Sequence, residues 1–176
     1  MNEAARHDKK VVGFVGHSGA GKTTLATRVT HLLATKGIRV SVLKNAHHDF
    51  DMDRPGKDSW RYRESGAREV MVRSGGRYAM LVECPEQPSV EELLALFTRA
   101  ELVIVEGFKN EGEFPKIEVR RRGASDHAAP LWPDNPQIRA LATDDPEAAR
   151  AAREAGLTVL SVNDPEAVAE YIESQL

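Results

Sequence analysis

The sequence predicts an α/β fold in which a mostly parallel sheet lies between two layers of helices. Short apolar, β-branched segments alternate with segments of helical periodicity along most of the 176 residues. This alternation favours parallel strands joined by crossover helices. A glycine-rich turn at residues 16–23 follows the first of these strands, and a short hairpin near residue 75 adds an antiparallel extension.

The first strand, turn and helix carry the clearest motif. Residues 11–15 are apolar and predict a buried strand, and residues 22–35 place apolar side chains at helical spacing. Between them the chain reads GHSGAGKT, which matches G-x-x-x-x-G-K-[ST], the phosphate-binding loop or P-loop. The motif is informative only between a strand and a helix, and here it has that context. The predicted fold class is therefore a P-loop NTPase-type three-layer sandwich.

The chemistry of this loop assigns roles to its residues. Glycines allow positive φ angles and bring backbone N–H groups close to a phosphate, and the helix N-terminus adds further donors. Lys22 would reach the β- and γ-phosphates and assist catalysis, and the Thr23 hydroxyl would ligate Mg²⁺. The expected nucleotide-binding residues of the loop are Gly16, Ser18, Gly19, Ala20, Gly21, Lys22, Thr23 and Thr24.

The remaining elements are predicted from periodicity and from turn residues. The segment at 115–122 alternates apolar and charged residues and is expected to be a half-exposed strand, whereas residues 124–135 have no helical period and could form a lid or a subunit contact. Strands are expected at 38–43, 69–73, 77–83, 102–106, 138–142 and 157–162, and helices at 60–65, from 90 onward, at 147–155 and at 166–175.

A second candidate site feature is the acid that ends the apolar strand at 102–106. An apolar strand that ends in a carboxylate resembles a Walker B element, in which the acid holds a Mg²⁺-bound water or polarises the attacking water. Glu106 is thus a candidate metal-binding and catalytic residue, and Gly107 would allow the following loop to approach phosphate. The alternative is a buried strand whose last residue happens to be acidic.

A third feature is the charged loop at residues 44–59. It leaves the end of the second strand, and ligands of open parallel sheets bind outside the carboxyl ends of the strands. His47, His48, Asp49 and Asp51 are candidate active-site residues that could bind a metal or position water. Their spacing is not specific for a metal, and the alternative is a solvated loop.

Two further segments could contact the nucleotide. Asp144 follows a predicted strand, and its carboxylate could accept the N1–H and N2–H groups of guanine, a donor pair that adenine does not present. The alternative is an ordinary helix N-cap before Pro146. The basic run at 120–122 could bind phosphate or RNA, although a solvated strand end is the simpler interpretation.

Composition limits the classes of function. The net charge of −3 provides no general attraction to nucleic acid or to an anionic membrane, and no apolar run approaches the length of a membrane span. The single cysteine, Cys84, excludes an internal disulfide and favours a reducing compartment, so we expect a cytoplasmic protein. Residues 1–9 are expected to be a flexible leader and residues 10–176 a single P-loop domain.

Taken together, these residues resemble the MobB family of molybdopterin-guanine dinucleotide biosynthesis adaptor proteins. The resemblance extends from about residue 10 to the last helix. Its specific part is HHDFDMD at 47–53, PGKDS at 55–59, Arg63, Gly66-Ala67 and VEGFK at 105–109. One departure is that Lys44 precedes Asn45 and Ala46, where the family often has Lys-His.

The resemblance implies a homodimer that binds GTP, hydrolyses it weakly at most, and assists the MobA-type guanylyltransferase that attaches GMP to molybdopterin. We therefore expect a Mg²⁺–GTP-binding adaptor, with molybdopterin as a further candidate ligand. One alternative is a P-loop small-molecule kinase, with arginines at 61, 63 and 68 or at 120–122 as its lid. Another is a metallochaperone-type GTPase that uses His47 and His48. The P-loop alone does not separate GTP from ATP.

Overall fold

The chain divides into two compact units in the computed structural model, which describes residues 9–46, 51–124 and 128–175. Unit 1 comprises Met1–Asn45 and Val90–Leu176, and unit 2 comprises Ala46–Ser89. Of the leader expected from the sequence, residues 1–8 lie outside the described residues. The expectation of a single P-loop domain over 10–176 stays a prediction.

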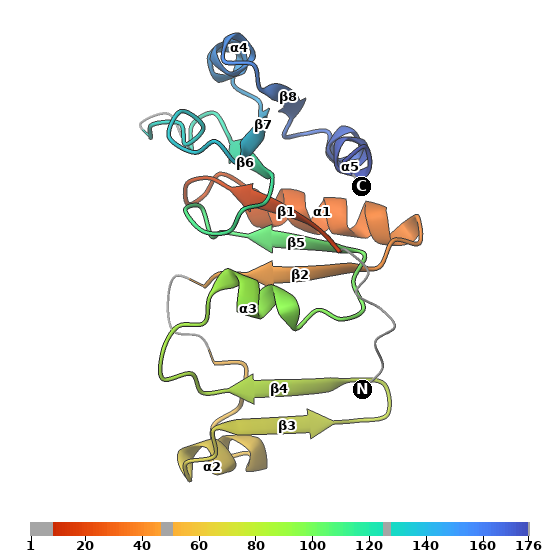
Figure 1. Ribbon diagram of the computed structural model, residues 1–176, viewed down its shortest axis with the longest axis vertical. Coiled ribbons are helices and arrows are strands. Elements are labelled where there is room, and N and C mark those ends of the chain that lie inside the picture. The colour runs from red at the N-terminus through yellow and green to blue at the C-terminus, as the bar shows by residue number, and fades with distance from the viewer. Residues whose placement is uncertain (1–8, 47–50, 125–127, 176) are drawn as a thin grey trace. The chain divides into compact units, whose positions relative to one another are not determined.

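Unit 1 is built on a parallel sheet (Figure 1). Its order, within the described chain, is β2-β5-β1-β6-β7-β8, and each neighbouring pair is parallel. The mostly parallel sheet predicted from the sequence is thus confirmed. Its strands are β1 (Lys10–Val15), β2 (Val40–Lys44), β5 (Leu102–Glu106), β6 (Lys116–Arg120), β7 (Ile138–Thr143) and β8 (Thr158–Ser161).

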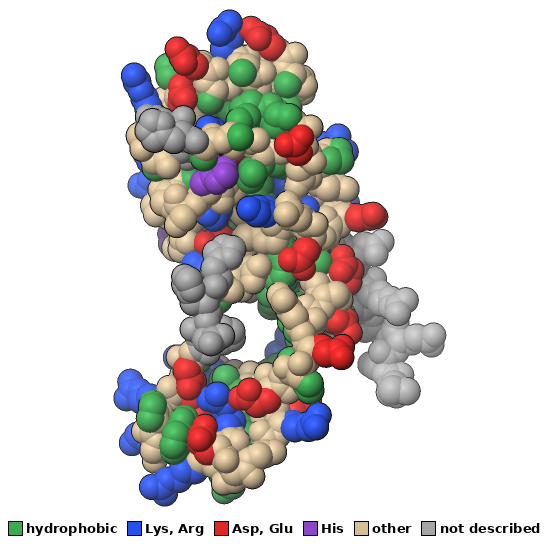
Figure 2. Space-filling model, turned by 90° about the vertical axis from the view of Figure 1, so that its left-hand side faces the viewer, with side chains coloured by type: hydrophobic (Ala, Val, Ile, Leu, Met, Phe, Trp, Pro, Cys, Tyr) green, Lys and Arg blue, Asp and Glu red, His purple; other side chains and the backbone are tan. Residues whose placement is uncertain are grey.

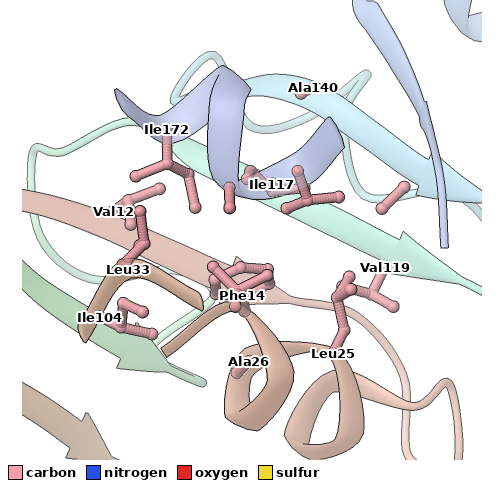
Figure 3. Close-up of a cluster of buried hydrophobic side chains, with 14 of the residues drawn as sticks. Val12, Phe14, Leu25, Ala26, Leu33, Ile104, Ile117, Val119, Ala140 and Ile172 are labelled. Atoms are coloured by element: carbon pink, nitrogen blue, oxygen red, sulfur yellow. The ribbon is translucent and has the colours of Figure 1, made fainter. Parts of the chain in front are cut away.

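Helices cover both faces of this sheet, which gives the predicted three layers. On one face, α1 (Lys22–Thr35) and α5 (Pro165–Glu173) pack against Leu102 and Ile104 of β5 in a buried cluster (Figure 3). On the other face, Val103 and Val105 of β5 pack with the first residue of α3 (Val90–Ala95). Because both faces are buried, β5 reads as a continuous apolar run. Helix α4 (Pro146–Glu154) packs on β7 and β8.

The boundaries of these elements agree with the sequence within two residues wherever both ends are predicted. Helix α1 has the predicted bounds. Strand β2 begins at Val40 rather than at 38, because the N–H of Ile38 donates to the Leu33 carbonyl and closes the end of α1. Gly37, with φ of 89°, supplies the left-handed residue that this helix end requires.

Strand β6 contradicts the expectation of a half-exposed strand, because all five of its residues are buried. It pairs with β1 on one side and with β7 on the other, so neither edge faces solvent. Ile117 and Val119 join the cluster beside α1 and α5. The alternating charged residues lie on the opposite face of the strand, where they are buried as well. The alternation in the sequence therefore separates two interior faces.

Unit 2 contains helix α2 (Asp58–Glu64) and the antiparallel hairpin of β3 (Glu69–Arg73) and β4 (Tyr78–Val82). This hairpin confirms the predicted antiparallel extension. Arg63 of α2 forms ion pairs with Asp51 at 3.1 Å, Asp53 at 3.5 Å and Glu83 at 2.7 Å. These contacts tie the helix to the loop before it and to the chain after β4.

None of the helices in the described chain has the length and apolar character needed to cross a membrane.

Candidate functional site

The carboxyl edge of the unit 1 sheet carries the glycine-rich loop, and Figure 2 views the molecule from that side. Gly16, Gly19 and Gly21 have φ angles of 143°, 79° and 89°, which residues with a side chain rarely adopt. A methyl group on Gly16 would collide with the Val119 carbonyl oxygen. The loop backbone therefore rests directly against β6, and its turns depend on glycine, as the motif predicts.

Lys22 is the first residue of α1 and folds back over the loop. Its Nζ donates hydrogen bonds of 2.9 Å to the carbonyl oxygens of Gly16 and His17. Burial lowers the pKa of Lys22, while the nearby Glu106 carboxylate opposes that shift. The ammonium is thus held above the loop by neutral acceptors, which an anionic phosphate group could replace.

Thr23 and Glu106 meet next to this lysine. The Thr23 hydroxyl donates to Glu106 Oε1 at 2.6 Å, and Glu106 itself is only 8% exposed. The two residues come from neighbouring parts of the fold, because β1 leads into the loop and pairs with β5, which ends at Glu106. The two residues assigned from the sequence to the metal therefore lie in contact.

Lys44 completes this group and was not among the predicted site residues. Its Nζ lies 3.1 Å from Glu106 Oε1 and donates to the Thr23 hydroxyl oxygen at 3.1 Å. Lys44 and Glu106 are paired residues at the ends of neighbouring strands β2 and β5. The sequence offered one weak signal, a basic residue at a predicted strand end. Lys44 lies beside Glu106 because β2 pairs with β5 rather than with β1.

Asp144 lies at the same edge, after β7. Its Oδ1 accepts the backbone N–H of Arg122 at 2.8 Å, and its Oδ2 accepts Nη1 of Arg121 at 3.2 Å. The N-cap of α4 is Asp145, whose side chain accepts the N–H of Glu147. The N-cap alternative for Asp144 is therefore wrong, and its role in base recognition stays a prediction.

The sequence favoured a solvated strand end for the basic run at 120–122, and the structure contradicts this for two of its three residues. Arg120 is buried and donates to the Ala128 carbonyl and to Glu118, and Arg121 is half-buried. Only Arg122 is exposed. Two of the three guanidinium groups are engaged within the chain.

The irregular segment after β6 is anchored at several points. Glu118 Oε2 accepts the backbone N–H groups of Leu131 at 2.9 Å and Trp132 at 3.1 Å. His17 of the P-loop hydrogen-bonds through Nε2 to the Ala129 carbonyl at 2.9 Å. Residues 128–132 are thereby connected both to the sheet interior and to the phosphate-binding loop.

The predicted charged loop is only partly described. His47, His48 and Asp49 lie outside the described residues. Asp51 belongs to unit 2, where hydrogen bonds from the Asp53 backbone and from Arg63 lower its pKa. Among the residues that the structure describes, no group of three or more His, Cys, Asp or Glu is placed to hold a metal ion.

The parallel sheet, the loop between β1 and α1, and the acid at the end of β5 define a P-loop nucleotide-binding type of protein. A family model, "Molybdopterin guanine dinucleotide synthesis protein B", matches residues 11–144. The chain belongs to this MobB family.

Relatives agree with that assignment. The chain is 37% identical over 168 residues to a molybdopterin-guanine dinucleotide biosynthesis adapter protein from Haemophilus influenzae, covering 94% of this chain and 89% of that protein. It is 36% identical to the adapter protein of the same name from Escherichia coli, over 92% of this chain and 90% of that protein.

Solved structures of the family share the fold. The crystal structure of Bacillus subtilis MobB has a TM-score of 0.73 at 24% identity, covering 95% of this chain and 98% of that chain. A crystal structure of molybdopterin-guanine biosynthesis protein B has a TM-score of 0.65 at 28% identity, covering 94% of this chain and 99% of that chain.

Proposed function

We propose that this chain is a Mg²⁺–GTP-binding adapter in molybdopterin guanine dinucleotide biosynthesis. In this role it would assist the guanylyltransferase that joins GMP to molybdopterin. The observation that carries the proposal is the contact of Thr23 with Glu106, close to Lys22 at the carboxyl edge of the sheet, in a chain whose relatives are named adapters. We place the protein in the cytoplasm and expect it to act as a homodimer.

The residues present fit a nucleoside triphosphate with its bound Mg²⁺. The positive φ angles of Gly16, Gly19 and Gly21 leave a turn without side chains, which lets backbone N–H groups approach phosphate oxygens. Lys22 would exchange its carbonyl acceptors for the β- and γ-phosphates. Of the remaining loop residues, Ser18, Ala20 and Thr24 would contribute backbone N–H groups.

Thr23 and Glu106 supply the oxygen ligands that Mg²⁺ prefers. When bound, the metal neutralises charge on the phosphates. Lys44 contacts the same carboxylate oxygen of Glu106, Oε1, that Thr23 contacts, so two side chains position the acid. Glu106 would then orient water through its free lone pairs. We propose slow hydrolysis, with Lys22 and Glu106 as its catalytic residues.

The guanine preference is assigned to Asp144. Its carboxylate lies at the same sheet edge as the P-loop, after β7, and its two oxygens are acceptors that suit two adjacent donors. Guanine offers two adjacent donors to such a group, whereas adenine offers an acceptor at the N1 position. His47, His48, Asp49 and Asp51 remain candidates for contact with the γ-phosphate, the pterin or the partner enzyme.

The experiment is a titration of the purified chain with GTP and with ATP in the presence of Mg²⁺, with and without the guanylyltransferase. We expect tighter binding of GTP than of ATP, slow hydrolysis by the chain alone, and a complex with the partner enzyme. Rapid hydrolysis, or transfer of phosphate to a nucleoside or a pterin, would contradict the adapter role.

Lys22→Ala tests the assignment of the P-loop as the phosphate-binding site. The loss of a charge-assisted contact to phosphate should weaken GTP binding by roughly 100-fold. Because the Lys22 ammonium donates to loop carbonyls rather than to the sheet, the circular dichroism spectrum should not change. Unchanged GTP affinity in this variant would refute the assignment of the P-loop.

A further inference from the structure

The neighbouring parallel strands β6, β7 and β8 end at the carboxyl edge of the unit 1 sheet, and each is followed by a polar side chain. Arg121 follows β6, Asp144 follows β7, and Asn163 comes two residues after β8. Nη1 of Arg121 donates to Asp144 Oδ2 at 3.2 Å and to Asn163 Oδ1 at 3.1 Å. One guanidinium nitrogen therefore uses both of its hydrogens to bridge the two neighbouring loops.

The donor chemistry of this arginine is that of the guanine base. Guanine carries N1–H and the N2 amino group on a single carbon, so its recognition edge is a guanidine unit. The Arg121 guanidinium likewise presents N–H groups on a single carbon, and a carboxylate accepts either group in the same way. Asp144, the residue assigned to guanine, is thus already occupied by a group that has the donors of guanine.

The rest of the Arg121 side chain reaches toward the P-loop. A methyl group built on Gly21 would lie 3.5 Å from Nε of Arg121, which is ordinary van der Waals contact, so the arginine lies close to the loop at Gly21. The side chain of Arg121 is 38% exposed and that of Asp144 is 25% exposed, so the ion pair is open to exchange with solvent or ligand. The arginine consequently lies between the phosphate-binding loop and the acceptor for the base.

We propose that Arg121 occupies the guanine site when no nucleotide is bound, and that GTP binds by displacing its guanidinium from Asp144. This inference rests on the proposed function, because it deepens the assignment of Asp144 to guanine. A base with two adjacent donors can replace the bonds that the arginine gives up. A base without them would leave the carboxylate without that donor, so Asp144 favours guanine over adenine in the place that the arginine vacates.

The test is Arg121→Met, which keeps the length of the side chain and removes its donors. A partly exposed ion pair is worth up to about 1 kcal/mol, so its removal should tighten GTP binding by about two- to fivefold. Binding of tripolyphosphate should not change, because it has no base, and that value also shows that the loop is folded. The matched control is Arg122→Met, in which the backbone N–H to Asp144 is retained and GTP affinity should not change.

Each other outcome overturns the inference in a recognisable way. Weaker binding of both GTP and tripolyphosphate to Arg121→Met would make Arg121 a phosphate ligand. Unchanged GTP affinity would show that the arginine does not compete with the base. If the wild type and Asp144→Asn both bind GTP and ATP equally, the guanine assignment itself fails. If Asp144→Asn lowers a clear GTP preference while Arg121→Met does not tighten GTP binding, only the inference about Arg121 fails.

Discussion

Folded proteins usually bury apolar side chains and expose charged ones. Strand β6 instead buries charged side chains, and the β3–β4 hairpin exposes apolar ones. Strand β6 buries Lys116, Glu118 and Arg120, which are 2%, 0% and 7% exposed. The hairpin instead exposes apolar side chains, among them Met71 at 60% and Tyr78 at 67%. The comparison shows that the charges of β6 have partners within the chain, whereas the apolar side chains of the hairpin are left exposed.

The charges of β6 find their partners inside unit 1. Glu118 accepts two backbone N–H groups and pairs with Arg120 at 3.4 Å, although burial raises its pKa. Lys116 donates to the Gly112 carbonyl at 2.9 Å and lies 4.7 Å from the centre of the Phe114 ring. The absence of a side chain at Gly13 makes room for Lys116 and Phe114. Buried charges are tolerated when they are paired in this way.

The apolar residues of the hairpin have no such cover within the described part of unit 2. Met71 pairs with Met80, and Tyr78 and Val82 lie on the same face of the hairpin; these four residues are 44% to 67% exposed. Both strands also have an unpaired edge in the described sheet. Exposed apolar faces and open strand edges commonly mark protein contacts. They support the proposal of a homodimer, with this face as part of its interface.

The largest effect on stability is expected when the buried hydrogen bonds and the ion pair of β6 are removed. Glu118→Ala removes the acceptor of two buried backbone N–H groups and the carboxylate that pairs with Arg120, which should lower the free energy of unfolding by about 3 to 5 kcal/mol. Urea unfolding followed by circular dichroism measures this change. Glu113→Ala, an exposed acid just before β6, is the control and should have almost no effect. A loss below about 1 kcal/mol for Glu118→Ala would mean that the network contributes little.

An intermediate effect is expected when charge is placed on the exposed face of the hairpin. Met80→Lys should weaken self-association by roughly tenfold or more, because a charge would be buried in the dimer contact. Sedimentation across a range of concentrations measures the shift, and GTP affinity should not change. Glu86→Lys, at an exposed position outside the hairpin, should leave self-association intact. An equal shift in both variants would locate the interface elsewhere.

The smallest effect concerns the buried lysine of β6. Burial lowers the pKa of Lys116 below its ordinary value of 10.5, so the folded chain releases this proton at a lower pH than the unfolded chain. Stability gained from this group therefore rises with pH between the two values. Lys116→Met should remove that rise, as measured by urea unfolding from pH 8 upward, whereas Lys10→Met, an exposed control, should retain it.

The sequence predicted the site better than it predicted the surroundings of the site. The P-loop and Glu106 could be identified because their motif has a fixed spacing and a fixed context of strand and helix. Lys44 could not be identified as a member of the site because it is a single basic residue at a strand end, and Arg121 could not be distinguished from its neighbours in the basic run at 120–122. Their roles depend on which strands are neighbours, and sheet order is not encoded in local periodicity.

Local patterns by themselves determined the elements of this protein: the helix at α1, the hairpin in unit 2 and the glycine turn that only glycine can form. The tertiary structure alone decided that β6 is an interior strand, because burial depends on the neighbours β1 and β7 rather than on the alternation of β6 itself. It also decided that Arg121 is paired with Asp144. Propensity and periodicity act within a few residues, whereas the pairing of charges acts across strands distant in the sequence.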